Sequence, residues 1–192
     1  MTRVALAARG GDRDLLARLV ALTRNDVWRL CAYLVDRSAA DDLTQETYLR
    51  LISGLARYRG EAPARTWVLA IARHTCLDHL RARIARRAVE SGVPLELAGH
   101  PCVPDESGTH AVRQLLLGLD DDQRDALILT QIVGLSYDEA ARVVAVPVGT
   151  IRSRVARARA RLVAMLDAAE GLPQRPGRPT RPITASLRAM AF

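Results

Sequence analysis

The stretch SYDEAARVVAVPVGTIRSRVARARARL, residues 136–162, predicts two helices separated by a tight turn. Ser136 and Glu139 match the S-x-x-E capping box, in which the two side chains satisfy free backbone amides at the start of a helix. We therefore expect a helix over residues 137–144. Pro147 lacks an amide hydrogen and cannot continue that helix, so a second helix should open directly after it. Two short helices joined in this way form a helix-turn-helix.

The second of these helices has a narrow apolar stripe and a basic outer face. At about 100° per residue, Ile151, Val155, Ala158 and Leu162 fall within one stripe that should face the protein interior. Small side chains on the opposite face would let the helix approach base edges, while guanidinium groups beside them reach guanine or phosphate. That outer face carries Ser153, Ala156 and Ala160 at its centre, with Thr150, Arg154 and Arg157 on one side and Arg152 and Arg159 on the other.

A solvated helix could also use arginines for solubility. Such a helix normally places acids four residues from bases, which offsets the repulsion between like charges. Residues 147–162 hold five arginines and no acid. We therefore favour DNA contact over simple solvation for this face, although the motif does not say which DNA is bound.

The composition of the whole chain favours helices and a polyanionic partner. Hydrophobic residues make up 49% of the 192 residues and aromatic ones only 4%, so the interior must be built from Leu, Ala, Val and Ile. The net charge is +7 and all 28 basic residues are arginine, which pairs well with phosphate and guanine but can also reflect a GC-rich genome. The sequence shows no signal peptide, membrane span or disulfide framework. We expect a soluble, cytoplasmic protein.

Breaks in the helical periodicity divide the chain into two helical domains. After an N-terminal segment, residues 1–11, about three long helices should fill the first domain, residues 12–84. Residues 85–109 are rich in proline and glycine and are expected to form a flexible linker. The second domain should cover residues 110–169. The basic tail, residues 170–192, is expected to be mostly disordered, with a phosphate-attracting arm or a partner-binding segment as alternatives.

One helix of the first domain, in SAADDLTQETYLRLISGLARY (residues 38–58), has an unusual outer face. Its inner face should carry Leu43, Thr47, Tyr48, Leu51 and Leu55. Leu49 lies on the opposite face, among acidic and amide side chains. An apolar anchor with a polar rim suits a protein interface. An ordinary surface helix with one stray leucine is the alternative.

A loop containing Gly60 and Pro63 connects that helix to the next one. Tyr58, Arg59 and Arg65 flank the loop, and aromatic and arginine side chains beside a loop are suited to stacking on an unpaired base. Trp67 is expected to be a core residue. The basic cluster around it, with Arg73, His74 and Arg81, is expected at the surface.

Three stretches resemble the extracytoplasmic-function sigma factors, the compact group of the bacterial sigma-70 family. DDLTQETYLRL (residues 41–51) is similar to region 2.2 of that family, and ARTWVLAIARHTCLDHLR (residues 64–81) to regions 2.3 and 2.4. DDDQRDALILTQIVGLSYDEAARVVAVPVGTIRSRVARARARL (residues 120–162) is similar to region 4. The similarity covers residues 12–166 in the expected order, and its details resemble the SigC-type subgroup.

The resemblance implies an all-α protein of two small helical domains joined by a flexible linker, which acts as a transcription initiation factor and not as an enzyme. No cofactor, small-molecule substrate or membrane is implied. The partners would be core RNA polymerase, through the clamp helices of its beta-prime subunit and through its beta subunit, and promoter DNA. The linker would run toward the active-site cleft and RNA exit channel. An anti-sigma factor is a common further partner in the family, although no residue here demonstrates it.

The resemblance also implies three sets of contact residues. The clamp helices would meet Asp41, Asp42, Gln45, Glu46, Leu49 and Arg50. The minus-10 element, with one base flipped out of the stack, would meet Tyr58, Arg59, Arg65, Trp67, Ala70, Arg73, His74 and Leu77. The minus-35 element would meet Thr150, Arg152, Ser153, Arg154 and Arg157 in its major groove. His74 stands where the family often has a small polar residue, so the minus-10 preference could differ here.

Two other classes explain less of the sequence. An enzyme or metal protein would need convergent ligands, but His74, Cys76 and His79 lie on different sides of a helix, and His100 and Cys102 have no obvious partner except His110. A helix-turn-helix repressor that binds duplex DNA as a dimer would leave the Leu49 face and the loop before Trp67 unexplained. No P-loop, G-x-S-x-G or H-E-x-x-H motif is present.

Overall fold

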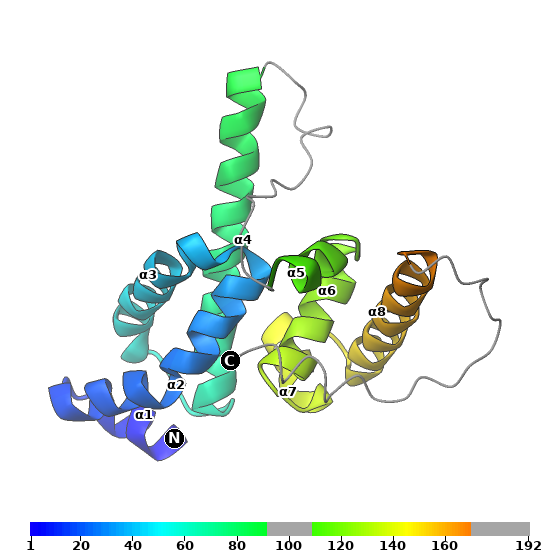
Figure 1. The fold of residues 1–192 in the computed structure, drawn as a ribbon. Coiled ribbons are helices and arrows are strands. Elements are labelled where there is room, and N and C mark those ends of the chain that lie inside the picture. The colour runs from blue at the N-terminus through cyan, green and yellow to red at the C-terminus, as the bar shows by residue number, and fades with distance from the viewer. Residues whose placement is uncertain (92–108, 170–192) are drawn as a thin grey trace. The chain divides into compact units, whose positions relative to one another are not determined.

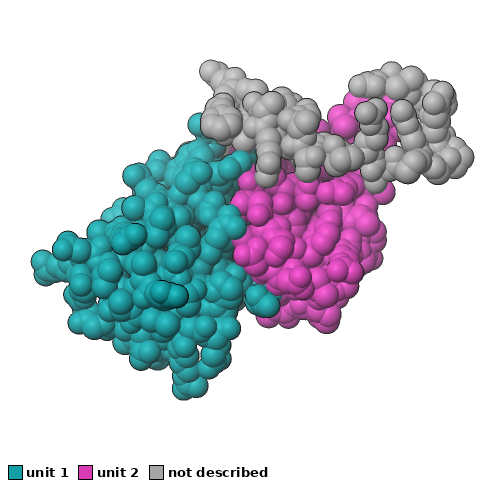
Figure 2. Space-filling view, turned by 90° about the horizontal axis from the view of Figure 1, so that it is seen from below, with its two compact units in different colours: residues 1–102, 142–144 teal, residues 103–141, 145–192 magenta. Residues whose placement is uncertain are grey.

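The structure, a computed structural model, describes residues 1–91 and 109–169. Every regular element in these two ranges is helical (Figure 1). The chain forms two compact units, shown in teal and magenta in Figure 2. Helices α1 to α4 belong to the first unit and α5 to α8 to the second. We describe α7 with the second unit because the residues on both sides of it belong there. The prediction of an all-helical fold is confirmed.

The first unit contains the three long helices that the periodicity predicts. Asp12 caps the first of them by accepting hydrogen bonds from the amides of Asp14 and Leu15, at 2.9 and 3.1 Å. Asp36 caps the second by accepting from the amide of Ala39 at 2.8 Å. A short helix precedes all three. The elements are α1 (Thr2–Ala8), α2 (Arg13–Leu34), α3 (Arg37–Leu55) and α4 (Ala64–Ser91).

Helices α2, α3 and α4 lie side by side and enclose one aliphatic core (Figure 1). Leu30, Leu51 and Leu69 contribute one fully buried side chain from each helix. Two hydroxyls inside this core pair with each other: the oxygens of Thr23 and Tyr48 lie 2.9 Å apart, and Thr23 also donates to the carbonyl of Leu19. Burying an unpaired hydroxyl would be costly, so these bonds help to fix α3 against α2.

The short helix α1, which the sequence did not predict, supports the loop before α4. The amide of Ala64 donates to Thr2 Oγ1 at 3.2 Å, so α1 supplies a cap for the start of α4. Gly60 has a φ of +77°, and a Cβ at that position would lie 3.2 Å from Leu6 Cδ1. Glycine is therefore favoured there by its backbone angle, and a larger residue would also require the Leu6 side chain of α1 to shift.

The expected start of the linker at residue 85 is wrong. Helix α4 continues to Ser91, and Figure 1 shows its last turns extending past α2 and α3. Ala85, Arg86, Arg87 and Ala88 all favour helix, and no helix breaker occurs before Gly92. The rest of the expected linker and the tail 170–192 lie outside the described residues.

The second unit contains the predicted helix-turn-helix. Ser136 and Glu139 form the complete capping box, with Ser136 N donating to Glu139 Oε2 at 2.9 Å and Glu139 N donating to Ser136 Oγ at 3.2 Å. Ala145 closes the first helix with a φ of +58°. The elements are α5 (Thr109–Leu117), α6 (Asp121–Leu127), a π-helical segment η2 (Ile128–Ile132), α7 (Tyr137–Val144) and α8 (Val148–Ala169).

A buried arginine organises the joint between α5 and α6. Arg124 is only 5% exposed, and its guanidinium donates to the carbonyls of Leu116 and Leu119, both at 3.0 Å. Asp121 neutralises it at 3.1 Å. A carbonyl in the last turn of α5 and one just after the helix are thereby satisfied by a charged side chain, which is a favourable arrangement at a helix C-terminus.

None of the helices in the two described ranges combines the length and the apolar character needed to cross a bilayer.

Candidate protein-binding and nucleic-acid interfaces

The inner and outer faces of α8 lie where the sequence predicts them. Ile151, Val155, Ala158 and Leu162 are all buried in the second unit. Ser153 and Ala156 are exposed on the opposite side. The Ser153 hydroxyl donates to the carbonyl of Thr150 at 2.9 Å, so its lone pairs are still directed outward and can accept a hydrogen bond. The side chains at the centre of the outer face are therefore short, and the serine among them can still accept a hydrogen bond.

The arginines of α8 do not form one uniform face. Arg152, Arg157 and Arg161 are exposed. Arg154 is different: its side chain is only 15% exposed and forms an ion pair with Asp122 in the first turn of α6. Arg159 is half-buried and donates to Gln131 Oε1 at 2.9 Å. Arg154, which the sequence predicts as a DNA contact, is thus already paired within the second unit.

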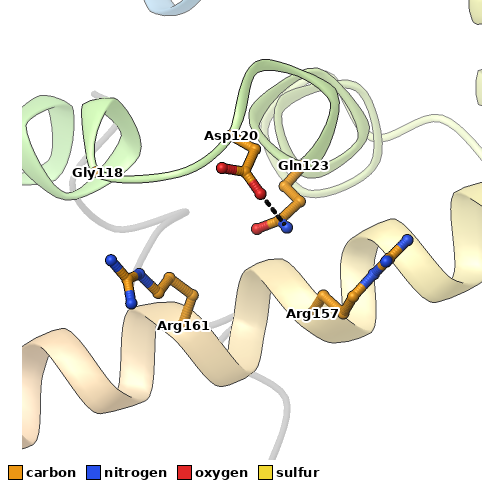
Figure 3. A pocket seen from close by; sticks show the side chains of 5 residues that line it. All are labelled: Gly118, Asp120, Gln123, Arg157 and Arg161. Atoms are coloured by element: carbon orange, nitrogen blue, oxygen red, sulfur yellow. Dashed lines mark hydrogen bonds between the residues drawn. The ribbon is translucent and has the colours of Figure 1, made fainter.

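A polar pocket of about 470 Å³ lies beside α8, between it and the turn that joins α5 to α6 (Figure 3). Asp120 and Gln123 form its upper wall, where Gln123 Nε2 donates to Asp120 Oδ2 at 2.7 Å. Arg157 and Arg161 project from α8 on either side of that pair. Arg161 was not predicted as a contact, although its position four residues after Arg157 would have indicated it.

The outer face of α3 carries two exposed apolar side chains. Leu49 is 57% exposed and Ile52 is 50% exposed. Asp42 and Gln45 lie exposed on the same helix, while Leu51 on its inner face is fully buried. The sequence predicted Leu49 but missed Ile52, which its position three residues further on would have placed beside Leu49.

Two polar networks border this α3 face. Asp41 accepts a hydrogen bond from the indole of Trp28 at 3.1 Å, and the guanidinium of Arg37 lies 5.6 Å from the centre of the Trp28 ring. At the other border, Arg50 donates to Glu46 at 2.8 Å and to Asp78 of α4 at 2.6 Å. The hydrogen bond from Arg50 holds the pKa of Asp78 below its ordinary value.

The loop before α4 corrects one expectation. Tyr58 was predicted to offer its ring to an unpaired base, but it is 5% exposed. Its ring stacks on Trp67 at a centroid distance of 4.6 Å, and its hydroxyl donates to the carbonyl of Ala62 at 2.5 Å. Tyr58 therefore shapes the loop from inside. Trp67, its stacking partner, is only half-buried, so it is less enclosed than the core position expected for it.

The other predicted residues of this region differ in exposure. Arg59 at the loop is 81% exposed, with a long 3.9 Å contact to Glu61. Arg65 is instead held by Asp26 of α2 at 2.7 Å. His74 is exposed, and its Nδ1 lies 2.7 Å from the carbonyl of Ala70, so Nε2 points away from that bond. Ala70, Arg73 and Leu77 are half-buried.

The residues weighed for a metal site do not converge. Cys76 is fully buried against Cys31, with their sulfur atoms 3.5 Å apart, whereas His74 is exposed on another side of α4. Burial, and after it the charge of Arg83, lowers the pKa of His79. No group of three potential ligands lies together in residues 1–91 and 109–169. His100 and Cys102 lie outside these residues.

Comparison with known proteins assigns the family. Residues 19–87 match the family described as sigma-70 region 2, and residues 109–162 match sigma-70 region 4. The chain belongs to the sigma-70 family and is an RNA polymerase sigma factor. It is 46% identical over 166 residues to the ECF RNA polymerase sigma factor SigC of Mycobacterium tuberculosis, covering 85% of this chain and 90% of that protein. The resemblance to the extracytoplasmic-function group, including its SigC type, is confirmed.

More distant relatives and solved structures are also sigma factors. The RNA polymerase sigma-H factor of Pseudomonas aeruginosa is 35% identical over 164 residues, covering 78% of this chain and 84% of that protein. The structure of CnrH in complex with the cytosolic domain of CnrY superposes with a TM-score of 0.69 at 30% identity, covering 87% of this chain and 97% of that one. The sigma factor RpoE of Bartonella quintana, solved with the anti-sigma factor NepR, gives a TM-score of 0.66 at 27% identity, covering 79% and 96%.

Proposed function

We propose that this sigma factor binds core RNA polymerase through the outer face of α3 and promoter DNA through α4 and α8. The observation that carries the proposal is the separation of two unlike surfaces. Leu49 and Ile52 stand exposed among acidic and amide side chains on α3, whereas α8 exposes small residues beside arginines. The first suits a protein partner with a hydrophobic anchor site, and the second suits a polyanion.

The contact with core polymerase would centre on Leu49, with Ile52 beside it. Asp42 and Gln45 would form the exposed polar rim, and Asp41 would be oriented by its bond to Trp28. Glu46 and Arg50 pair with each other, so they would complete the rim as a unit. By family resemblance, the partner surface is the pair of clamp helices of the beta-prime subunit.

The minus-10 contact would use the exposed groups near the start of α4. Arg59 and His74 are the accessible polar members, with Ala70, Arg73 and Leu77 forming the half-buried surface beside them. Tyr58, Trp67 and Arg65 would support this surface from within, since Tyr58 stacks on Trp67 and Arg65 pairs with Asp26. Flipping a base costs about a few kcal/mol, which the protein must offset by enclosing that base.

The minus-35 contact would use the outer face of α8. Ser153 and Ala156 would lie nearest the base edges, with Arg152 and Arg157 on either side and Thr150 at the start of the helix. Arg161 adds a second guanidinium at the pocket beside Arg157, where a backbone phosphate would be well placed between the two charges.

Two further proposals concern the regulation of this chain and where it acts. Because RpoE of Bartonella quintana was solved with an anti-sigma factor, we propose that a protein of that kind also restrains this chain. We further propose that the chain acts in the cytoplasm, together with polymerase, and contributes no catalytic step of its own.

The decisive experiment is reconstitution with mycobacterial core RNA polymerase. We expect co-elution on gel filtration, followed by initiation from members of a random promoter library that share a minus-10 and a minus-35 element. A repressor would behave differently, since it would bind a palindromic duplex as a dimer without polymerase. Binding of a palindromic duplex by a dimer without polymerase would contradict the proposal, and so would a failure to co-elute with polymerase.

A further inference from the structure

We propose that Arg154 and Arg159 are positioning residues, which hold α8 from both sides and set the rotation of its DNA-contacting face. The inference rests on the proposed function, because it concerns how that face is presented to the minus-35 element. It removes Arg154 from the set of direct contacts that the sequence predicted and gives Arg159 a defined task.

Arg154 is held by the first turn of α6. Its Nη2 pairs with Asp122 Oδ2, across 32 positions of sequence. Its Nη1 is enclosed by protein, without a hydrogen-bond partner in the described part of the chain. With 15% of the side chain exposed, the guanidinium faces α6 and has little surface left to offer a DNA backbone.

Arg159 is held by a different element. Its Nη2 donates to Gln131 Oε1 at 2.9 Å, across 28 positions of sequence. Gln131 belongs to the π-helical segment η2, which the periodicity of the sequence did not predict. In a π-helix each amide bonds five residues back, as Val133 N does to Ile128 O at 2.9 Å, and the wider turn changes the direction of the side chains that follow.

Arg154 and Arg159, which each tether α8 to another element, lie symmetrically about its buried stripe. At about 100° per residue, Arg154 and Arg159 are each about 70° from the centre of the stripe formed by Ile151, Val155, Ala158 and Leu162, on opposite sides. A tether on one side alone would resist rotation in one direction only. Together, the pairs with Asp122 and Gln131 resist rotation of α8 in both directions.

Rotation matters because base contacts tolerate little displacement. The surface of a helix with its side chains lies about 5 Å from the axis, so a rotation of about 20° moves Ser153 or Arg157 by about 2 Å. A hydrogen bond to a base edge does not survive a shift of that size. The apolar stripe includes the small side chain of Ala158, which by itself interlocks only weakly with neighbouring helices.

Asp122 allows a test in which the two possible roles of Arg154 predict opposite signs. If Arg154 touches DNA, neutralising Asp122 releases its guanidinium and removes a negative charge, so DNA binding becomes tighter. If Arg154 positions α8, the same change loosens the helix and weakens sequence-specific binding. Asp138 is a matched control, because it is an exposed aspartate in the first turn of α7, as Asp122 is in the first turn of α6, and it does not line the pocket beside α8.

The experiment measures binding of the reconstituted holoenzyme to a promoter selected from the library and to the same promoter with its minus-35 element scrambled. We expect Asp122→Asn to lower the affinity for the intact promoter by about fivefold, the net scale of one ordinary hydrogen bond, with little change on the scrambled one. Gln131→Met, which keeps the volume but removes the acceptor, should act in the same direction by about twofold. Asp138→Asn should not reduce the ratio of the two affinities.

The outcomes separate the inference from the proposed function. Tighter or unchanged binding by Asp122→Asn would overturn the positioning role, provided that circular dichroism shows the variant to be folded. A loss of equal size on the intact and scrambled promoters would also overturn it, because a purely structural defect does not change discrimination. Arg152→Ala tests the proposed function separately: if it leaves promoter affinity unchanged, α8 does not read the minus-35 element through this face.

Discussion

Helix α3 exposes Leu49 and Ile52 between acidic and amide side chains, whereas α8 exposes Ser153 and Ala156 between arginines. Both helices bury a regular apolar face, so their inner sides look alike. Their outer sides differ in charge: α3 carries three acids and two arginines, and α8 carries five arginines and one acid. The fold therefore uses one kind of packing to present two kinds of surface.

Arginines on the two helices need not be free to contact a partner. Arg50 of α3 pairs with Asp78 of α4, and Arg154 of α8 pairs with Asp122 of α6. The first pair is about half exposed and the second leaves Arg154 largely buried. An exposed pair is worth little energetically, while a buried one constrains its helix more strongly. The net charge of a surface thus overstates the number of arginines that can meet a partner.

The largest effect is expected at a buried pair of the first unit. Asp36 accepts hydrogen bonds from Ser38, the amide of Ala39 and Arg83, and its side chain is 5% exposed. Asp36→Ala would leave Arg83 buried without its partner, at a cost of about 3 to 5 kcal/mol in the free energy of unfolding. Urea unfolding followed by tryptophan fluorescence measures this, because both tryptophans, Trp28 and Trp67, lie in the first unit.

The same aspartate predicts a pH dependence. Burial alone would raise the pKa of Asp36, but the hydrogen bonds from Ser38, Ala39 and Arg83 outweigh it, and the pKa is lowered. The contribution of Asp36 to stability is therefore fully present above the unfolded pKa, about 4, and is lost as the pH falls below that value through the folded pKa. Asp36→Ala should lose stability less steeply than the wild type on acidification. Parallel acid titrations would contradict this.

The second effect tests the protein-binding side of the comparison. Leu49→Ala with Ile52→Ala should weaken binding to core polymerase by about 2 kcal/mol or more, as expected for an apolar anchor at the centre of an interface. Because both side chains are at least half exposed, the free energy of unfolding should change little. Competition for labelled core polymerase measures the affinity. Leu22→Ala, at a leucine of α2 that is 47% exposed, is the control. Equal losses in both variants would count against a specific α3 interface.

The third effect tests the DNA-binding side. Arg157→Ala should weaken promoter-specific binding by about 1 to 3 kcal/mol if the side chain reaches a base. Arg161→Ala should instead weaken binding to all sequences alike and reduce the salt dependence, as expected for a phosphate contact. Holoenzyme binding to promoters with varied minus-35 elements, at several salt concentrations, distinguishes them. If the loss for Arg157→Ala were uniform across sequences, Arg157 would be a phosphate contact as well.

The smallest effect is expected at the exposed pair of the first unit. Asp78→Asn removes the charge opposite Arg50, but Asp78 is 48% exposed, so the free energy of unfolding should fall by only about 0.2 to 1 kcal/mol. The effect should shrink further in high salt. A cost as large as that of Asp36→Ala would show that exposure is the wrong measure of what such a pair contributes.

Much of the fold could be predicted because it depends on local spacing. The capping box at Ser136 and Glu139, the break at Pro147 and the apolar stripe of α8 follow from residues within about one or two helical turns of one another. The exposed Leu49 follows in the same way. Helix α1 and segment η2 could not be predicted, since α1 is stabilised by contacts with the distant loop before α4, and π-helical hydrogen bonding leaves no simple repeat in the sequence. The left-handed backbone angle of Ala145 could not be predicted either, because glycine is the usual residue at such a position.

By itself, the sequence determined most of the longer helices and which side of each faces the interior, because the helical repeat relates neighbours only three or four positions apart. The tertiary structure decided which outward residues are available to a partner. Tyr58 is enclosed by Trp67, Arg65 is held by Asp26, and Arg154 is held by Asp122. The two arginines meet their partners across 39 and 32 positions, respectively, and no local pattern encodes such pairs, since they form only when separate helices pack together.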